Sequence, residues 1–243
     1  MPTQTVASTP LPHRLTPSYV AMILFLIIAI LTVLSVAEQA VIHLLGRADL
    51  EEYLIAFDLD AEGNIPTWYS SFQLLAAAGL LFVIGMITRR RAEPFAGHWR
   101  ALGWILTALS IDEIAQLHEH LGHLHESWHT HGILYFAWVV PGLAAVAVVG
   151  VLFLRFAYHL PSATRNRLVF AAIVYFIGAL GVEALSGWRA ETMGYNNMTH
   201  SLIATVEEVM ELSGIAMVIV ALLRHMQAHG MALTLSADES GAQ

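Results

Sequence analysis

The sequence contains no cysteine and no lysine, and each absence excludes certain kinds of bond and catalytic group. Without cysteine there is no disulfide, no thiolate metal ligand and no thiol nucleophile. All 11 basic residues are arginine, so a lysine Schiff base is excluded as well. Charged residues make up only 12% of the chain, and the net charge of −8 argues against nucleic acid as a partner, because nucleic-acid binding requires a basic surface.

The residues that are present are mostly apolar: 57% are hydrophobic, and the mean hydropathy is +0.63. This is too apolar for an ordinary soluble domain and indicates a membrane protein. Six apolar runs are long enough to cross roughly 30 Å of hydrocarbon, and lipid favours helices because it offers backbone groups no hydrogen-bond partner. The predicted fold is an all-α, polytopic membrane bundle of six transmembrane helices, at residues 19–45, 68–88, 101–121, 133–158, 168–187 and 201–224.

The arginines lie almost entirely on one side of the predicted membrane. Only Arg47 and Arg189 fall on the opposite side, so the positive-inside rule places both termini in the cytoplasm. We expect a multi-pass protein of the cell (inner) membrane, with the lipid bilayer as its main partner. The predicted organisation is a disordered cytoplasmic tail, a six-helix transmembrane domain and a flexible cytoplasmic tail, at residues 1–18, 19–226 and 227–243.

The outer loop at 46–67 is long and acidic for a helix connection, and we expect it to act as a lid with a short helix through LEEYLIAF. Its DLDAEGNIPTWY segment resembles the start of a calcium-binding loop. The twelfth position is Tyr69, however, where that loop needs a bidentate glutamate. An Asx-type turn leading to Pro66 is the preferred interpretation.

Polar residues of the predicted helices gather in the outer half of the membrane. A charged group in hydrocarbon costs roughly 2.5 to 3.5 kcal/mol, so acids at one depth on several helices should face one another around a polar pocket. With a helical period of 3.6 residues, one face of the 101–121 helix carries Asp112, Gln116, Glu119 and His123.

A second polar face is predicted at the start of the last helix, where His200, Glu207 and Glu211 share one side and Glu208 lies beside them. Glu183 is expected about 8 Å below the outer end of its helix, which is predicted to end near Trp188. These positions predict that two helix faces and one further acid close around a single pocket.

The acids of such a pocket require compensation, because closely spaced carboxylates in a low-dielectric site cannot all be ionised. Protonation or bound cations supply it. For cations, a set of carboxylates and imidazoles without sulfur suits iron, zinc or manganese, with iron and zinc preferred. The predicted metal ligands are Asp112, Glu119, His123, Glu183, Glu208 and Glu211. The residues that support or replace them are Glu113, Gln116, His120, His200, Glu207 and Ser70.

The predicted function is a metal site near the outer leaflet that serves lipid-like or other apolar substrates. Iron favours an oxidoreductase; zinc favours a hydrolase with Glu113 or Glu207 as general base. Whether the chain is an enzyme stays open. The alternatives are a proton or cation pathway, and an accessory or scaffold subunit that binds other proteins of a membrane complex. Haem is not expected, and HEHLGH, residues 118–123, is one residue too long for the zinc-protease signature.

Overall fold

The computed structural model describes residues 16–117 and 130–231, and all regular structure in these two segments is helical. The long helices are α1 (Pro17–His43), α3 (Ile65–Arg90), α4 (Ala96–Ala115), α7 (Val139–His159) and α10 (Met198–Ala228). A further continuous helix consists of α8 (Ser162–Phe176), the π-helical turn η4 (Ile177–Val182) and α9 (Glu183–Met193). Short helices are η1 (Ala48–Leu50), α2 (Glu51–Leu54), η2 (Ile55–Phe57) and η3 (Gly132–Leu134).

Four of these helices are long and apolar enough to cross a membrane: Pro17–His43, Ile65–Arg90, Val139–His159 and Ser162–Met193. The prediction of an all-helical fold is therefore confirmed for the described residues, and four of the six predicted spans are long and apolar enough to cross a membrane. The other two long helices, α4 with 20 residues and α10 with 31, contain several charged residues within their length.

Capping residues fix where the helices begin. Asn64 accepts a hydrogen bond from the Thr67 backbone N–H at 3.2 Å, immediately beside Pro66 in the first turn of α3. Asn197 caps α10 in the same way through the His200 backbone N–H, at 3.1 Å. Both side chains satisfy backbone donors that a first helical turn leaves without intrahelical partners. The Asx-type turn predicted before Pro66 is confirmed.

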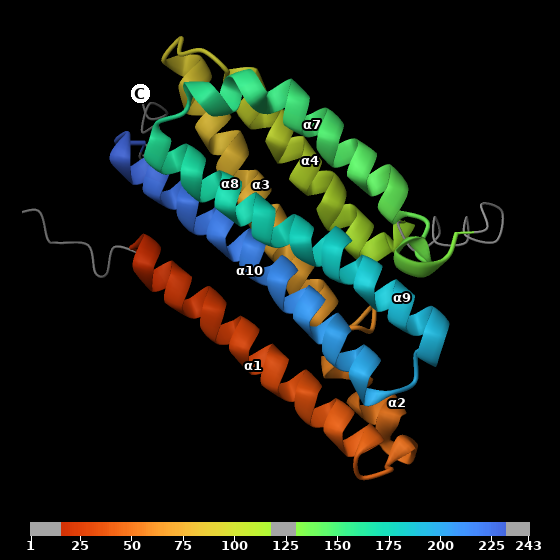
Figure 1. Cartoon of the computed structure of the whole chain (residues 1–243). Helices are drawn as coiled ribbons and strands as arrows, with labels where there is room; N and C mark the ends of the chain where they lie inside the picture. The colour runs from red at the N-terminus through yellow and green to blue at the C-terminus, as the bar shows by residue number, and fades with distance from the viewer. Residues whose placement is uncertain (1–15, 118–129, 232–243) are drawn as a thin grey trace, which may run out of the picture.

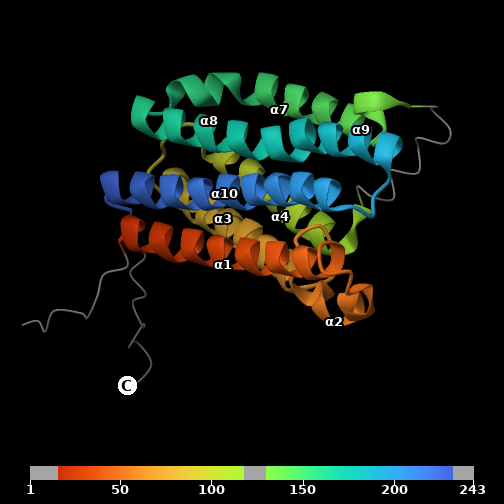
Figure 2. The same ribbon diagram turned by 60° about the horizontal axis from the view of Figure 1, so that its bottom comes forward.

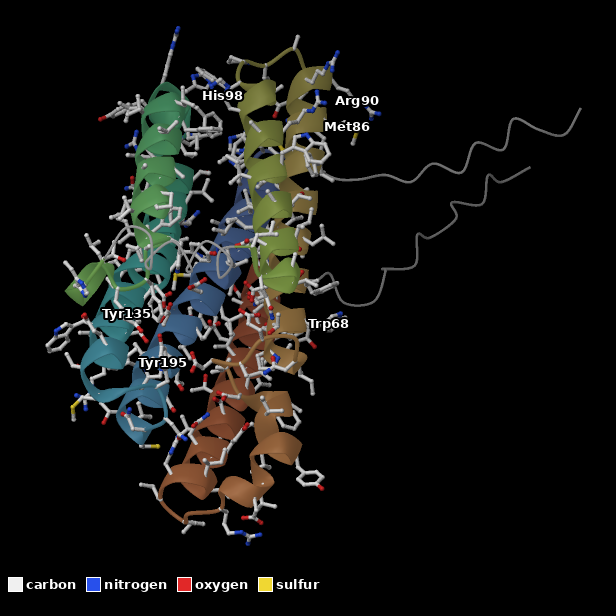
Figure 3. The ribbon with its side chains drawn as sticks, turned by 90° about the vertical axis from the view of Figure 1, so that its right-hand side faces the viewer. Trp68, Met86, Arg90, His98, Tyr135 and Tyr195 are labelled. Atoms are coloured by element: carbon white, nitrogen blue, oxygen red, sulfur yellow. The ribbon has the colours of Figure 1, made fainter. Side chains whose placement is uncertain are left out.

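α10 occupies the middle of the fold. It lies between α1 and α8 in both ribbon views and also contacts α3, which pairs along its length with α4 (Figures 1 and 2). Figure 2 shows α7, α8 and α9 as one layer, with α10 between that layer and α1. The arginine-bearing end of the bundle is marked by Arg90 and His98 in Figure 3, and Tyr195 lies toward the other end.

Two glycines allow α10 to approach the α8–α9 helix closely. A Cβ at Gly214 would lie 2.7 Å from the Tyr175 Cβ and 2.9 Å from its backbone N and Cα. A Cβ at Gly178 would lie 3.0 Å from the Glu207 carbonyl oxygen. Small residues at a helix interface allow such backbone proximity, which is a common basis of helix association in membranes.

α7 is held mainly at its two ends. It buries only Val139, near its start, and Phe156, near its end. Phe156 packs against the rings of Trp99, at 4.9 Å between centroids, and His98, at 5.5 Å. At the other end, a Cβ at Gly142 would lie 2.9 Å from Leu180 Cδ2 in η4. α7 therefore spans the molecule with little contact along its middle.

Two helices differ from the sequence prediction. α4 ends at Ala115, not at 121, and Gln116 adopts a left-handed conformation with φ of 54°. The regular periodicity that placed Gln116 on the face of Asp112 therefore stops there. The helix predicted at 168–187 runs from Ser162 to Met193 and contains the π-helical turn. Glu183 thus lies ten residues before the helix end, about 15 Å along the axis, and not 8 Å.

Candidate functional site

The loop between α1 and α3 folds back into the bundle. Its residues 58–62, here called the inserted loop, place Leu59 in a buried cluster with Leu31 of α1 and Leu212 of α10. The Leu59 side chain is only 4% exposed. A leucine buried between the first and last helices fixes the depth of the acids on either side of it.

Hydrogen bonds hold the inserted loop against α1. The Ser35 hydroxyl accepts from the Leu59 backbone N–H at 3.1 Å, and the Gln39 amide donates to Asp58 Oδ2 at 2.8 Å. Asp58 Oδ1 accepts from the Asp60 backbone N–H at 3.1 Å, and the Asn64 amide donates to the Asp58 carbonyl at 2.6 Å. The loop is thus a defined element, and its Asp60 and Glu62 line the cavity described next.

Acidic residues of four segments line one cavity. Glu208 of α10 has electrostatic interactions with Glu211 on the same helix and with Glu113 of α4. It interacts in the same way with Asp60 and Glu62 of the inserted loop. We refer to the eight cavity-lining acids of these segments and α9 together as the acid cluster: Asp60, Glu62, Asp112, Glu113, Glu183, Glu207, Glu208 and Glu211.

Glu183 links three elements. Its Oε1 accepts a hydrogen bond from Trp138 Nε1, just before α7, at 2.9 Å, and its carboxyl group shares a hydrogen bond with Glu207 of α10. Two carboxyl groups can share a hydrogen bond when one of them carries a proton, so the chemistry of this pair suits proton exchange at the edge of the cluster. The π-helical turn immediately precedes Glu183, and such turns occur frequently at functional sites.

Polar side chains surround the cluster at the same end of the molecule. His200 is buried, with Nδ1 3.4 Å from the Ser186 hydroxyl and Nε2 3.9 Å from Asp60 Oδ2. Tyr175 shares a hydrogen bond with Glu211. Glu211, Glu208, Glu207, Glu183 and His200 thus occupy one connected polar region.

The remaining predicted site residues lie elsewhere. Ser70 is buried in α3 and is not one of the cavity-lining residues, while its neighbour Ser71 pairs with Ser110 of α4, with 2.8 Å between their hydroxyl oxygens. Gln116 caps α4 and does not line the cavity either. Three predicted residues lie outside the described segments: Glu119, His120 and His123.

Within residues 16–117 and 130–231, no three histidine, aspartate or glutamate side chains are grouped closely enough to hold a metal ion. The described acids are neighbours in contact or at electrostatic range, but they do not form a complete ligand set. The prediction of metal binding therefore has no support from a preformed site in this part of the chain.

Sequence reasoning missed Asp60 and Glu62. The signal was present: Leu59 is an apolar residue between two aspartates in a loop of a chain that has few charges. Such alternation is typical of an extended segment with one buried side. In the structure residues 59–64 form a series of bends, and Asp60 and Glu62 are the acids of this segment that line the cavity.

Tyr195, in the connection between α9 and α10, donates a hydrogen bond from its hydroxyl to the Tyr135 hydroxyl oxygen at 3.2 Å. The pKa of Tyr195 is raised above its ordinary value of 10.0. Partial burial is the largest cause, and the hydrogen bond with Tyr135 is the next. We expect Tyr195 to keep its proton at a pH where exposed tyrosines ionise. The tyrosinate absorbance of the wild type minus that of Tyr195→Phe measures this, and Tyr135→Phe should shift the transition down.

The sign of the accompanying stability change follows from linkage. Because the pKa of Tyr195 is higher in the folded state, the associated stabilisation is complete below pH 10 and is lost as the pH rises through the folded-state pKa. A Tyr195 transition at the same pH as that of free tyrosine would contradict the observed contact.

Comparisons with known proteins identify a family for the chain but do not indicate an activity. No curated protein and no solved structure matches the chain. Residues 21–226, which include most of every long helix described above, match the model of one family. The chain therefore belongs to the family described as a domain of unknown function (DUF8692).

Proposed function

We propose that the chain crosses the membrane six times, with both termini in the cytoplasm, and that the acid cluster binds a mononuclear or dinuclear divalent metal centre at the outer end of the cavity. There it acts on lipid-like substrates as an oxidoreductase or hydrolase. The observation that carries this proposal is the meeting of eight carboxyl groups from four separate segments on one cavity. Such a concentration of acid is costly in a membrane unless it has a ligand.

Charge balance favours a cation as that ligand. The cavity-lining residues include one arginine, Arg165 in the first turn of α8, and this end of α8 is remote from Glu183 at the start of α9. His200 is the cavity-lining histidine among the described residues. A divalent ion neutralises two carboxylates at once, and carboxylate-rich sites with an occasional imidazole suit iron, manganese or zinc.

The residues divide into two groups with different roles. Glu208, Glu211 and Glu113, together with Asp60 and Glu62, provide oxygen donors from three segments. Binding requires these carboxylates to close around the ion by side-chain rotation, since no three described donors form a ligand group as placed. Asp112 and Glu183 are further candidate ligands, and Glu119 and His123 belong to the proposed set although they lie outside the described segments.

The Glu183–Glu207 pair is suited to proton transfer. One proton is shared between the two carboxyl groups, and Glu183 is fixed by the Trp138 indole at 2.9 Å. After it loses that proton, Glu207 is the general base for a water or substrate bound beside the metal. This assignment selects Glu207 over Glu113, which lies among the proposed metal ligands.

The test is metal analysis of the purified full-length chain. We expect stoichiometric divalent metal in the wild type and at least a tenfold loss of affinity in the Glu208→Gln, Glu211→Gln double variant. Glu93→Gln is the matched control, because Glu93 is half-exposed and forms only a long ion pair with Arg91 at 3.9 Å. It should bind metal as the wild type does.

Other outcomes separate the alternative functions. Absence of stoichiometric metal from the wild type, after incubation with iron, manganese and zinc in turn, would overturn the metal proposal. Proton flux in liposomes that survives chelation would indicate a proton pathway. Retention of membrane partners through native purification, with no effect of the double variant on the activity of their complex, would indicate an accessory subunit.

A further inference from the structure

The cavity is much larger than the acid cluster requires. Its volume is about 1560 Å³, whereas small-molecule sites typically measure about 300–1,000 Å³. Beyond the acids it is lined by apolar side chains of three helices, among them Leu102 and Leu106 of α4, Val149 and Phe153 of α7, and Leu168 and Ala172 of α8. A long apolar space with one acidic end matches the shape and polarity of an amphiphile.

The cavity is open along its length. Several lining side chains keep about half of their surface exposed, including Leu143 at 52%, Leu154 at 53% and Ile173 at 49%. α4 and α7 meet at the aromatic contacts of Phe156, and both helices line the cavity from there toward the acid cluster. In Figure 3, α10 lies behind α4 and α7. These exposed lining side chains belong to α7 and α8, two of the helices long and apolar enough to cross a membrane, where they would face the acyl chains of the bilayer.

The acid cluster restricts the head group of the ligand. Eight carboxyl groups repel an anionic head, and the nearest cavity-lining arginine, Arg165, is at the start of α8. An ammonium head would compete with a divalent metal for the same carboxylates. A hydroxyl does neither, because it donates a hydrogen bond to a carboxylate and is also a neutral ligand for a hard divalent cation.

We propose that the cavity binds a long-chain amphiphile with a hydroxyl head, which enters sideways from the bilayer beside α7. Its hydroxyl lies at the acid cluster, and its chain extends along Leu106 and Val149 toward Phe153. This assignment rests on the proposed metal function, since the metal is what favours a hydroxyl over an ammonium head. It names the substrate class for that site.

Two glycines provide a matched test of the position of the chain. Gly150 lines the cavity, and a Cβ placed on it meets nothing within 4 Å. Gly79 of α3 is equally open, but it lies outside the cavity lining. Gly150→Phe therefore fills the space proposed for the acyl chain, and Gly79→Phe adds the same side chain on another surface.

The experiment measures quenching of tryptophan fluorescence by dibrominated octadecanol, with the full chain in lipid nanodiscs. Trp138 reports on the cavity, and its signal is the wild type minus Trp138→Phe. Dibrominated octadecylamine and stearate are the comparison probes. We expect saturable quenching by the alcohol, at least tenfold weaker binding of the other two, and a tenfold loss of alcohol binding in Gly150→Phe but not in Gly79→Phe.

Equal quenching by all three probes, or quenching insensitive to Gly150→Phe, would overturn the inference, as would a preference for the amine or the acid. Metal content is measured on the same samples, so the two proposals fail separately. Bound metal without alcohol selectivity overturns the amphiphile and leaves the metal site. Alcohol selectivity that needs Gly150 but occurs in samples without metal overturns the metal function and, with it, the head-group assignment that rests on the metal.

Discussion

Gly214→Ala is expected to destabilise the folded protein by about 1 to 3 kcal/mol, the range for forcing an extra methyl group into a well-packed interface. The new Cβ would lie 2.7 to 2.9 Å from the Tyr175 Cβ and backbone, and backbone atoms do not move aside as a flexible side-chain end does. α10 would have to separate from α8. Equilibrium unfolding of the purified chain in detergent, followed by circular dichroism, measures the change in free energy.

The control for this substitution is expected to change the stability of the protein in the opposite direction. A Cβ added at Gly79 meets only open space, so Gly79→Ala should stabilise the helix by roughly 0.5 to 1 kcal/mol, because alanine loses less backbone entropy on folding. Gly178→Ala should fall between the two, since its contacts begin at 3.0 Å. Equal stability of the Gly214 and Gly79 variants would show that α8 and α10 are not in close contact.

Leu59→Ala is expected to cost about 2 to 5 kcal/mol, as for other buried leucines, and to weaken metal binding at the same time. Leu59 is 4% exposed between Leu31 and Leu212, and the next residue, Asp60, belongs to the acid cluster. Loss of the buried side chain removes the main apolar contact that keeps the inserted loop at its depth. Equilibrium unfolding and metal titration of the same preparations provide the two measurements.

The matched control is Leu44→Ala, because Leu44 is 68% exposed at the end of α1 and should lose little stability. Leu59→Met, which conserves volume, should recover most of both properties. If Leu59→Ala left stability and metal affinity unchanged, the inserted loop would not be packed against α1 and α10 in solution.

The helices could be predicted from the sequence because hydropathy reports directly on the transfer of side chains into lipid. The boundaries could not, since they depend on single residues in particular conformations. The left-handed Gln116 ends α4 six residues before the end of its predicted apolar run. The π-helical turn before Glu183 cannot be recognised from the sequence, because its hydrophobic periodicity is the same as that of a regular helix. The second change alters the face that Glu183 occupies.

In the candidate site, residues close together in the sequence could be grouped from the sequence alone. Residues far apart in the sequence could not. His200, Glu207 and Glu211 follow one helical face, and local periodicity was enough to group them. Asp60 reaches the cluster through contacts of its loop with Ser35 and Leu212, which are 24 and more than 150 residues from Leu59. No local pattern encodes such contacts.

The position of Leu59 also joins an early part of the chain to a late one. Translation produces α1 and the inserted loop early, but Leu212 belongs to α10, the last long helix to leave the ribosome. The inserted loop therefore lacks its Leu212 contact until α10 has been made. A chain that stops before α10 lacks Glu207, Glu208 and Glu211, so the acid cluster can form only after this helix has been made.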